Sequence, residues 1–108
     1  MSYQKVILIG NVGKDPVIRY VEKRAVASFS LATTETFANP AGGEPLKRVE
    51  WHQIVMWDAQ AEFAEKYIRK GTKLYVEGKL RSRTWEDRNA IKRTVTEIYV
   101  DYLEILSR

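Results

Sequence analysis

The amino-acid sequence predicts an all-β domain, a small five-stranded barrel with one short helix between its third and fourth strands. Two observations predict this architecture. Alternation of apolar and polar residues, interrupted by clusters of Gly, Pro, Asn and Asp, recurs along most of the 108-residue chain. Apolar residues at helical spacing occur in only one segment, between Asp58 and Gly71. The length suits a single domain over residues 1–108, which buries roughly two thirds of the surface that its unfolded chain exposes.

The first strand is predicted over residues 5–12, KVILIGNV, which are apolar on both faces. A small barrel covers only one face of such a strand, so a second subunit is the simplest cover for the other. The turn residues GKDP follow at 13–16, and strand alternation continues over residues 17–33 as the second strand. Residues 37–47, FANPAGGEPLK, predict a long loop because they are rich in Pro, Gly and Asn.

The third strand is predicted over residues 50–57, EWHQIVMW, and carries two tryptophans. Side chains of a strand alternate between two faces, so the strand divides into an outer and an inner set. The outer set is Trp51, Gln53, Val55 and Trp57, and the inner set is His52, Ile54 and Met56. Two large rings then stand on the outer face, where they need a partner surface or a ligand with flat faces of its own.

The single helix is predicted to follow Asp58, a plausible N-cap, and to end before Gly71, with Ala61, Ala64 and Ile68 at helical spacing. Alternation returns in a fourth strand over residues 72–85. EDRNA makes a turn at 86–90, and a last strand covers residues 91–103. Five strands with a helix between the third and the fourth is the element order of the OB-fold, a partly open Greek-key barrel.

The fourth strand carries the main chemical signal, because its two faces differ sharply. Its apolar or small residues suit the barrel interior, and they are Leu74, Val76, Gly78 and Leu80. Cations and aromatic rings share the other face, which contains Lys73, Tyr75, Glu77, Lys79, Arg81, Arg83 and Trp85. Cations that follow the phosphates, with rings on which exposed bases stack, are what single-stranded nucleic acid requires.

Two plainer interpretations stay open beside this one. Charged residues on a half-exposed strand are ordinarily a solvated face. The tryptophans at 51, 57 and 85 could also lie in the core or in a subunit interface, although each is in phase with polar neighbours. A basic surface alone would suit a duplex, a membrane or heparin equally well, and the tryptophans favour a single strand.

Catalysis, metals and cofactors find little support. The only histidine, His52, lies on the apolar side of its strand, where a buried or interface histidine is more common than a catalytic one. GNVGK at 10–14 is too short for a phosphate loop, and Asp15 stands where Ser or Thr would bind magnesium. No metal-ligand spacing occurs, so we expect no enzyme, metal or cofactor.

Three features that would indicate secretion or a membrane location are missing from the sequence. The chain has no cysteine, it begins without the basic and apolar pattern of a signal peptide, and no apolar run approaches membrane-spanning length. We expect a soluble, cytoplasmic protein without membrane partners. The net charge of +4 is a mild basic excess whose meaning depends on where the cations gather.

Five stretches closely resemble the bacterial single-stranded DNA-binding protein family, SSB, over nearly the whole chain and in the same order. They are KVILIGNVGKDPVIRY at 5–20, FSLATTET at 29–36, EWHQIVMW at 50–57, YIRKGTKLYVEGKLRSRTW at 67–85 and RTVTEI at 93–98. The resemblance implies an OB-fold homotetramer that wraps single-stranded DNA without sequence preference and protects it during replication, recombination and repair.

The resemblance also assigns site residues. Base-stacking aromatics of the family fall on Phe37, Trp51, Trp57 and Trp85, and its basic contacts fall on Lys5, Arg19, Lys70, Arg81 and Arg83. Because a carboxylate beside phosphates is repulsive, the Tyr75 and Glu77 end of the fourth strand is expected to meet another subunit. The expected subunit interface comprises Ile7, Ile9, His52, Tyr75 and Glu77.

The chain departs from the family pattern at two places. Asn89-Ala90 stands where the last hairpin usually has Asp-Gly, and Thr94 replaces a common Tyr. Family members typically continue into a Pro, Gly and Gln-rich linker and an acidic tip, whereas this chain stops at YLEILSR. Either the tail was removed or the chain is a tail-less phage, mobile-element or organellar relative, and partners that bind the tip are not expected.

The alternatives to a DNA-binding protein are an OB-fold primosome-type accessory protein and an oligomeric scaffold whose aromatic face is a protein interface.

Overall fold

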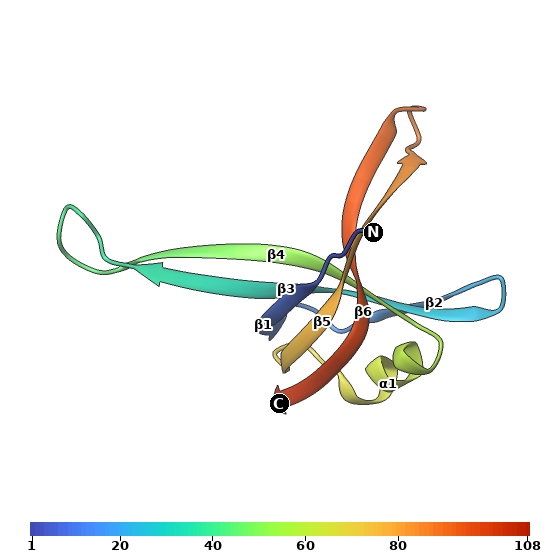
Figure 1. The fold of residues 1–108 in the computed structure, drawn as a ribbon, viewed down its shortest axis with the longest axis horizontal. Coiled ribbons are helices and arrows are strands. Elements are labelled where there is room, and N and C mark those ends of the chain that lie inside the picture. Colours follow the sequence, from blue (N-terminus) through green and yellow to red (C-terminus); the bar gives the residue numbers. More distant parts are fainter.

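A computed structural model describes residues 1–108 as six strands and one helix (Figure 1). The elements are β1 (Val6–Val12), β2 (Val17–Val21), β3 (Arg24–Phe37), β4 (Leu46–Trp57), α1 (Ala59–Tyr67), β5 (Lys73–Glu86) and β6 (Lys92–Ser107). The strand order is β1-β5-β6-β4-β3-β2, and pairing of β1 with β3 closes the barrel. The predicted OB-fold is therefore confirmed, with its helix between the strands that carry Trp57 and Arg81.

The predicted second strand is a hairpin, β2 and β3, and not one continuous strand. The chain reverses at Glu22 and Lys23, whose φ angles are 49° and 69°. Two consecutive positive φ angles suit a type I′ turn, which ordinarily uses Asn-Gly or Asp-Gly. Glu22-Lys23 stands there instead, so no local residue pattern marks the reversal.

Two long hairpins project from the barrel (Figure 1). Antiparallel pairing of β3 with β4 continues to Phe37 and Leu46, so most of the arm is a ladder and only residues 38–45 connect its strands. The predicted loop over 37–47 was accordingly too long at both ends. The second arm is the outer part of β5 and β6, where pairing extends to Glu86 and Lys92.

The barrel interior follows the predicted alternation through most of the chain. Its fully buried large side chains include Leu31, Ile54, Met56 and Leu74, and deletion of such a side chain typically costs about 2–5 kcal/mol. Leu80 was wrongly predicted to be interior, since it is 46% exposed. Leu80 pairs with Ile98, the last core residue of β6 toward the arm, and beyond this pair the two strands leave the barrel as a free arm (Figure 1).

The helix α1 covers one end of the barrel with its small residues Ala61 and Ala64, which are fully buried. Phe63 and Tyr67 lie on its outer side with ring centroids 4.9 Å apart. At nine residues, α1 is too short to cross a bilayer, and the chain contains no other helix.

Candidate nucleic-acid interface

The three tryptophans gather on one outer face of the sheet. Parallel pairing of Val55 with Tyr99 places β6 beside β4, and the antiparallel ladder of β6 with β5 continues the surface. We call this surface the tryptophan face, and its members are Trp51, Gln53 and Trp57 of β4, Tyr99 of β6, and Arg81, Arg83 and Trp85 of β5. Trp51 and Trp85 are 56% and 46% exposed, so both rings face outward. Trp57 is half-buried, with its ring centroid 6.3 Å from that of Tyr99.

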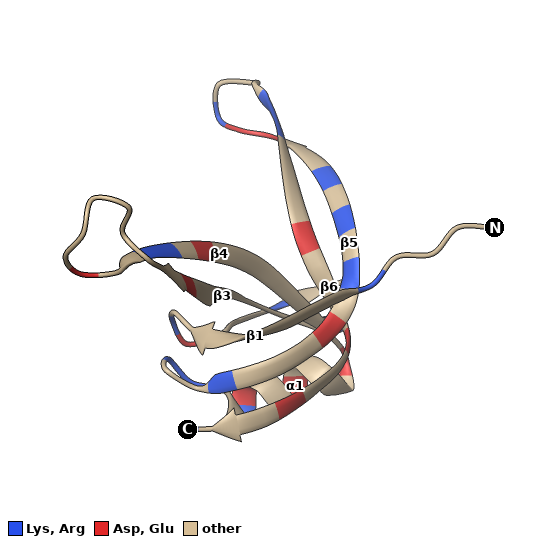
Figure 2. Cartoon of the chain, turned by 60° about the vertical axis from the view of Figure 1, so that its left-hand side comes forward, with Lys and Arg blue, Asp and Glu red and all other residues tan.

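A groove of about 430 Å³ lies at the Trp85 end of the tryptophan face. Three arginines line it together with Trp85 and Gln53: Arg19, Arg83 and Arg93. Gln53 also lines a second hollow beside Trp51, so the two hollows adjoin at this side chain, and together we call them the path between the two exposed rings. Figure 2 shows Lys and Arg positions following one another along the projecting part of β5. Rings and cations thus alternate along an open surface that could bind a flexible polyanion with flat bases.

The hollow beside Trp51 depends on a glycine. A Cβ built on Gly13 would lie 2.5 Å from Cζ3 of Trp51, so only glycine lets this ring lie against the β1–β2 turn. Lys14 follows on the same turn and lines the hollow. The turn itself is tied to the sheet, because the Gly13 N–H donates to the Ser30 carbonyl over 3.0 Å. GKDP at 13–16 was therefore correctly predicted to be a turn, whereas Gly10–Val12 of GNVGK belong to β1. This turn supports one of the exposed rings.

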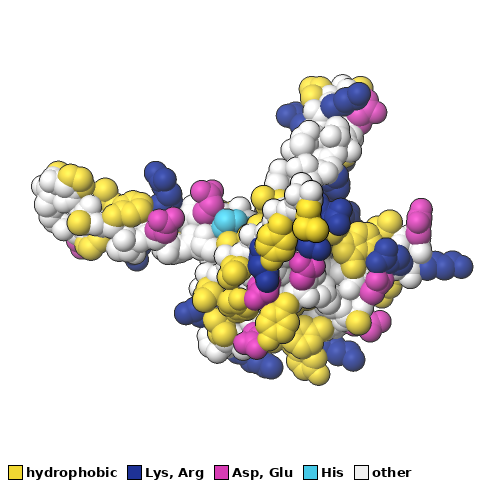
Figure 3. Space-filling view, in the orientation of Figure 1, with side chains coloured by type: hydrophobic (Ala, Val, Ile, Leu, Met, Phe, Trp, Pro, Cys, Tyr) yellow, Lys and Arg dark blue, Asp and Glu magenta, His cyan; other side chains and the backbone are white.

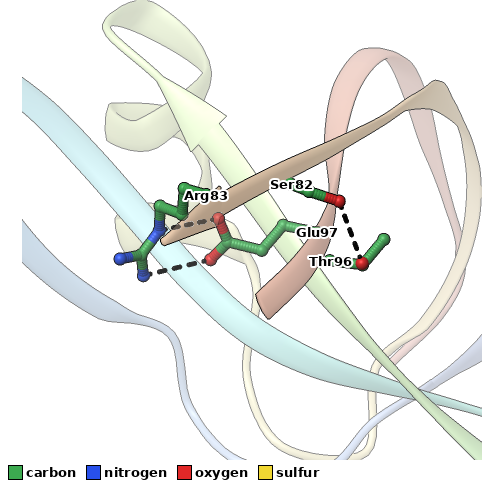
Figure 4. A network of polar contacts seen from close by, with 4 residues as sticks. All are labelled: Ser82, Arg83, Thr96 and Glu97. Carbon is green, nitrogen blue, oxygen red and sulfur yellow. Dashed lines mark hydrogen bonds and ion pairs between the residues drawn. The ribbon is translucent and has the colours of Figure 1, made fainter. Parts of the chain in front are cut away.

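Arg83 is held by a buried carboxylate (Figure 4). Its Nε donates to Oε1 of Glu97 over 3.0 Å, and an Nη donates to the second oxygen over 3.4 Å. The Glu97 side chain is 8% exposed and that of Arg83 is 45% exposed. The hydrogen bond to Glu97 raises the pKa of Arg83 above its ordinary value. The Glu97 carboxylate therefore fixes the orientation of the Arg83 guanidinium and neutralises part of its charge.

Arg81 has a different environment. Its guanidinium carbon lies 5.4 Å from the ring centroid of Tyr99, and it forms no ion pair. Arg81, Tyr99 and Trp57 line a hollow of about 700 Å³ together with Arg24. Of the arginines predicted on β5, Arg81 therefore keeps its full charge available for a ligand.

Three predicted site residues lie away from the tryptophan face. Phe37 pairs with Leu46 near the tip of the β3–β4 arm, five residues from Trp51 along β4, so strand alternation turns the two rings to opposite faces. Lys5 forms an ion pair with Glu77, its Nζ lying 3.0 Å from Oε1. Lys70 follows α1, where its backbone N–H donates to Asp15 over 2.7 Å. The roles of these three residues in binding stay predictions.

A second distinctive surface lies on β1 and its neighbours. We call it the β1 face, and its members are Lys5, Ile7, Ile9, Tyr75, Glu77, Tyr102 and Glu104. Ile7 and Ile9 are 56% and 52% exposed, whereas Val6 and Leu8 pack against the core. Figure 3 shows apolar side chains gathered over this part of the barrel. Hydrogen bonds from Tyr75 and then from Lys5 lower the pKa of Glu77, so this carboxylate is fixed as an anion.

His52 is not a member of the β1 face. It pairs with Leu31 across β3 and β4, and its Nε2 lies 2.9 Å from Oγ1 of Thr33. The ring is half-buried and belongs to the inner set of β4, as predicted. The hydrogen bond between His52 and the Thr33 hydroxyl links β4 to β3 at the base of the arm, which is a structural role.

Comparisons with known proteins agree on one family. The model of the single-strand binding protein family matches residues 3–106. The chain belongs to this family. It is 50% identical over 109 residues to a single-stranded DNA-binding protein of Bacteroides thetaiotaomicron, an alignment that covers 99% of this chain and 68% of that protein. It is also similar to the SSB of Plasmodium falciparum solved in a complex with ssDNA, with a TM-score of 0.85 and 36% identity over 99% of this chain and 97% of that one.

Several residues of the tryptophan face and of the hollows beside it were not predicted from the sequence. Arg24, Arg93 and Lys14 are cations in turns or at strand ends, where alternation assigns no face. Tyr99 lies in the last strand, and its place beside Trp57 follows from the parallel pairing of β4 with β6, which is a long-range contact. Gln53 was correctly placed on the outer face, although its position between two rings could not be read from one strand.

Proposed function

We propose that this chain binds single-stranded DNA without sequence preference and protects it during DNA replication, recombination and repair, as a binding protein and not as an enzyme. The observation that carries the proposal is the path between Trp51 and Trp85, along which exposed rings alternate with arginines. Every base has a flat face that can stack on a ring, so such a path tolerates any sequence. A duplex keeps its base faces stacked inside and cannot use the rings.

A fluorescence titration tests the proposal. Oligo(dT) should strongly quench tryptophan emission, whereas a duplex of equal length should quench it little. Replacement of Trp51 or Trp85 by Ala should weaken binding by about 1–3 kcal/mol, the range for one stacked base. Tyr3, which is 83% exposed and lies outside the tryptophan face, is the matched control, and Tyr3→Ala should bind normally. Absent quenching by oligo(dT) would favour a scaffold in which the tryptophan face is a protein interface.

We further propose that the chain assembles as a homotetramer in the cytoplasm and that the β1 face forms one of its subunit contacts. Two observations support this assembly. First, the apolar side chains of Ile7 and Ile9 are exposed on β1. Second, residues 6–10 of β1 pair only with β5, so the other edge of this part of the strand is open. An open strand edge beside apolar side chains is a surface that a second copy can extend by pairing.

Sedimentation at micromolar concentration tests the assembly. The parent chain should sediment as a tetramer, and Ile7→Glu with Ile9→Glu should give smaller species that still bind oligo(dT) at the tryptophan face. Val21, which is 41% exposed on β2, provides a control, since Val21→Glu should leave the tetramer intact. A parent chain that sediments as a monomer would contradict the proposed assembly while leaving DNA binding unaffected.

A further inference from the structure

Asp58 adopts a costly conformation just before α1. Its φ and ψ angles are 56° and −122°, a combination that belongs to the first central position of a type II′ turn and is ordinarily occupied by glycine. Aspartate is common at the N-cap because its carboxylate accepts a backbone N–H of the first helical turn. Asp58 occupies the N-cap position, as predicted, but its side chain makes no such bond. An unfavourable backbone without the usual capping bond indicates that the carboxylate has another role.

The carboxylate of Asp58 binds Arg24 instead. Nε of Arg24 donates to Oδ1 over 3.1 Å, and an Nη donates to Oδ2 over 2.6 Å. This bidentate pair holds the guanidinium against Trp57, with its central carbon 4.6 Å from the ring centroid. The backbone of Asp58 is fixed as well, because its N–H donates to the Ala25 carbonyl over 2.8 Å. Arg24 is thus stacked on a ring of the tryptophan face before any ligand arrives.

The resulting cluster is nearly symmetrical. Arg24 lies against Trp57, Arg81 lies against Tyr99, and the two rings are neighbours. Together the four side chains line the hollow of about 700 Å³. A guanidinium has five N–H donors, of which the two bonds to Asp58 use two, so Arg24 still presents three. Two guanidinium groups beside two rings suit a phosphate with an adjoining base.

We propose that Asp58 is a positioning residue that holds Arg24 on Trp57, so that Arg24 and Arg81 together bind one backbone phosphate of the strand. This inference rests on the proposed binding of single-stranded DNA. An arginine fixed in advance loses less side-chain entropy when it binds the phosphate. The aspartate also adds a negative charge beside the phosphate, which by itself opposes binding. The two effects have opposite signs, and this difference makes the role of Asp58 testable.

The decisive variant is Asp58→Asn, which removes the charge and keeps the size. Simple electrostatics predicts tighter binding of oligo(dT), because the net charge becomes more positive. Loss of positioning predicts weaker binding, by about two- to tenfold if one rotamer-rich side chain must now be ordered on binding. We expect the weaker binding. Arg24→Ala should weaken binding at least as much, and Asp58→Asn should cost nothing further in the Arg24→Ala background.

Two further variants separate positioning from charge and from stability. Glu62→Gln makes the same charge change one turn along α1, at an exposed side chain without an ion pair, and it should leave binding unchanged or slightly tighter. Asp58→Gly removes the carboxylate but suits the positive φ, so it should unfold at the same or higher urea concentration and still bind more weakly. In a Trp51→Phe, Trp85→Phe background, the remaining quenching reports occupancy of the Trp57 hollow directly.

The outcomes are distinct. Asp58→Asn that binds as tightly as Glu62→Gln, or more tightly than the parent, would overturn the positioning role. Arg24→Ala with unchanged affinity and unchanged Trp57 quenching would remove Arg24 from the site. Failure of the proposed function itself would appear differently, since the parent chain would not bind oligo(dT) at all.

Discussion

Arg83 donates from Nε to Oε1 of Glu97 over 3.0 Å, whereas its neighbour Arg81 has no carboxylate partner. The two arginines lie on the same face of β5 and were predicted to act alike. Their charges nevertheless differ in availability, because a phosphate that approaches Arg83 competes with an anion already in place. The number of cations on the tryptophan face therefore exceeds the number of phosphates that they can fully neutralise.

The salt dependence of binding should distinguish the two arginines. Each phosphate neutralised on a single strand contributes roughly 0.7 to the slope of log affinity against log salt. Arg81→Ala should lower the slope by about that amount, and Arg83→Ala should lower it by less than half as much. Lys66→Ala on α1 removes the same charge far from the grooves and should leave the slope unchanged. Affinities of oligo(dT) measured at several salt concentrations supply all three slopes, and equal losses for both arginines would show that Glu97 releases Arg83 on binding.

Gly13→Ala should displace the Trp51 ring without unfolding the barrel. The added Cβ would meet Cζ3 of Trp51 at 2.5 Å, and the ring, which is 56% exposed, can turn away. We expect weaker binding of oligo(dT), by up to the roughly 1–3 kcal/mol that one stacked base contributes. The matched test is the Trp51→Ala background, in which Gly13→Ala should have no further effect on affinity. A second loss there would mean that the β1–β2 turn contacts DNA by itself.

The extent to which sequence predicts this fold depends on the range of the interactions. Alternation correctly gave the inner set of β4 and the outward tryptophans, and helical spacing gave α1, because these follow from neighbours along one element. The turn at Glu22 and Lys23 was missed because the residue types do not signal positive φ. Leu80 was misplaced because it lies where the barrel ends, opposite Ile98 of β6, and the position of that end depends on long-range pairing. Arg24 was missed because its place follows from pairing with another strand and from the conformation of Asp58.

Asp87 should make the β5–β6 hairpin sensitive to acid. Its carboxylate accepts the backbone N–H groups of Asn89 and Ile91 and the Nε of Arg93. The hydrogen bond from Ile91, followed by those from Arg93 and Asn89, lowers the pKa of Asp87 below its ordinary value. A carboxyl group whose pKa is lower in the folded chain stabilises the fold above its unfolded pKa, and this contribution is lost as the pH falls through the folded value.

The comparison of the parent with Asp87→Asn tests this contribution. Near pH 6, the parent should unfold at higher urea concentration than the variant. The difference should narrow as the pH falls below about 4, the ordinary range of an aspartate, and it should vanish once Asp87 is protonated in the folded chain. Glu44→Gln, in the loop of the other arm, should show no such convergence. A difference that stays constant down to pH 2 would show that it does not arise from the ionisation of Asp87.

Ala90 should be the weak point of the same hairpin. Its φ is 61°, in the left-handed region, where a Cβ costs roughly 1–2 kcal/mol. Its N–H donates to the Asp87 carbonyl over 3.0 Å, so the turn is held in this conformation despite the cost.

Ala90→Gly should raise the free energy of unfolding by about 0.5–1 kcal/mol, because glycine removes the steric penalty but gains more freedom when unfolded. Ala41→Gly, at a loop position without positive φ, should instead be neutral or slightly destabilising, and urea titration of both variants gives the comparison. A destabilising Ala90→Gly would show that the alanine side chain makes a favourable contact in the tip that outweighs its backbone strain.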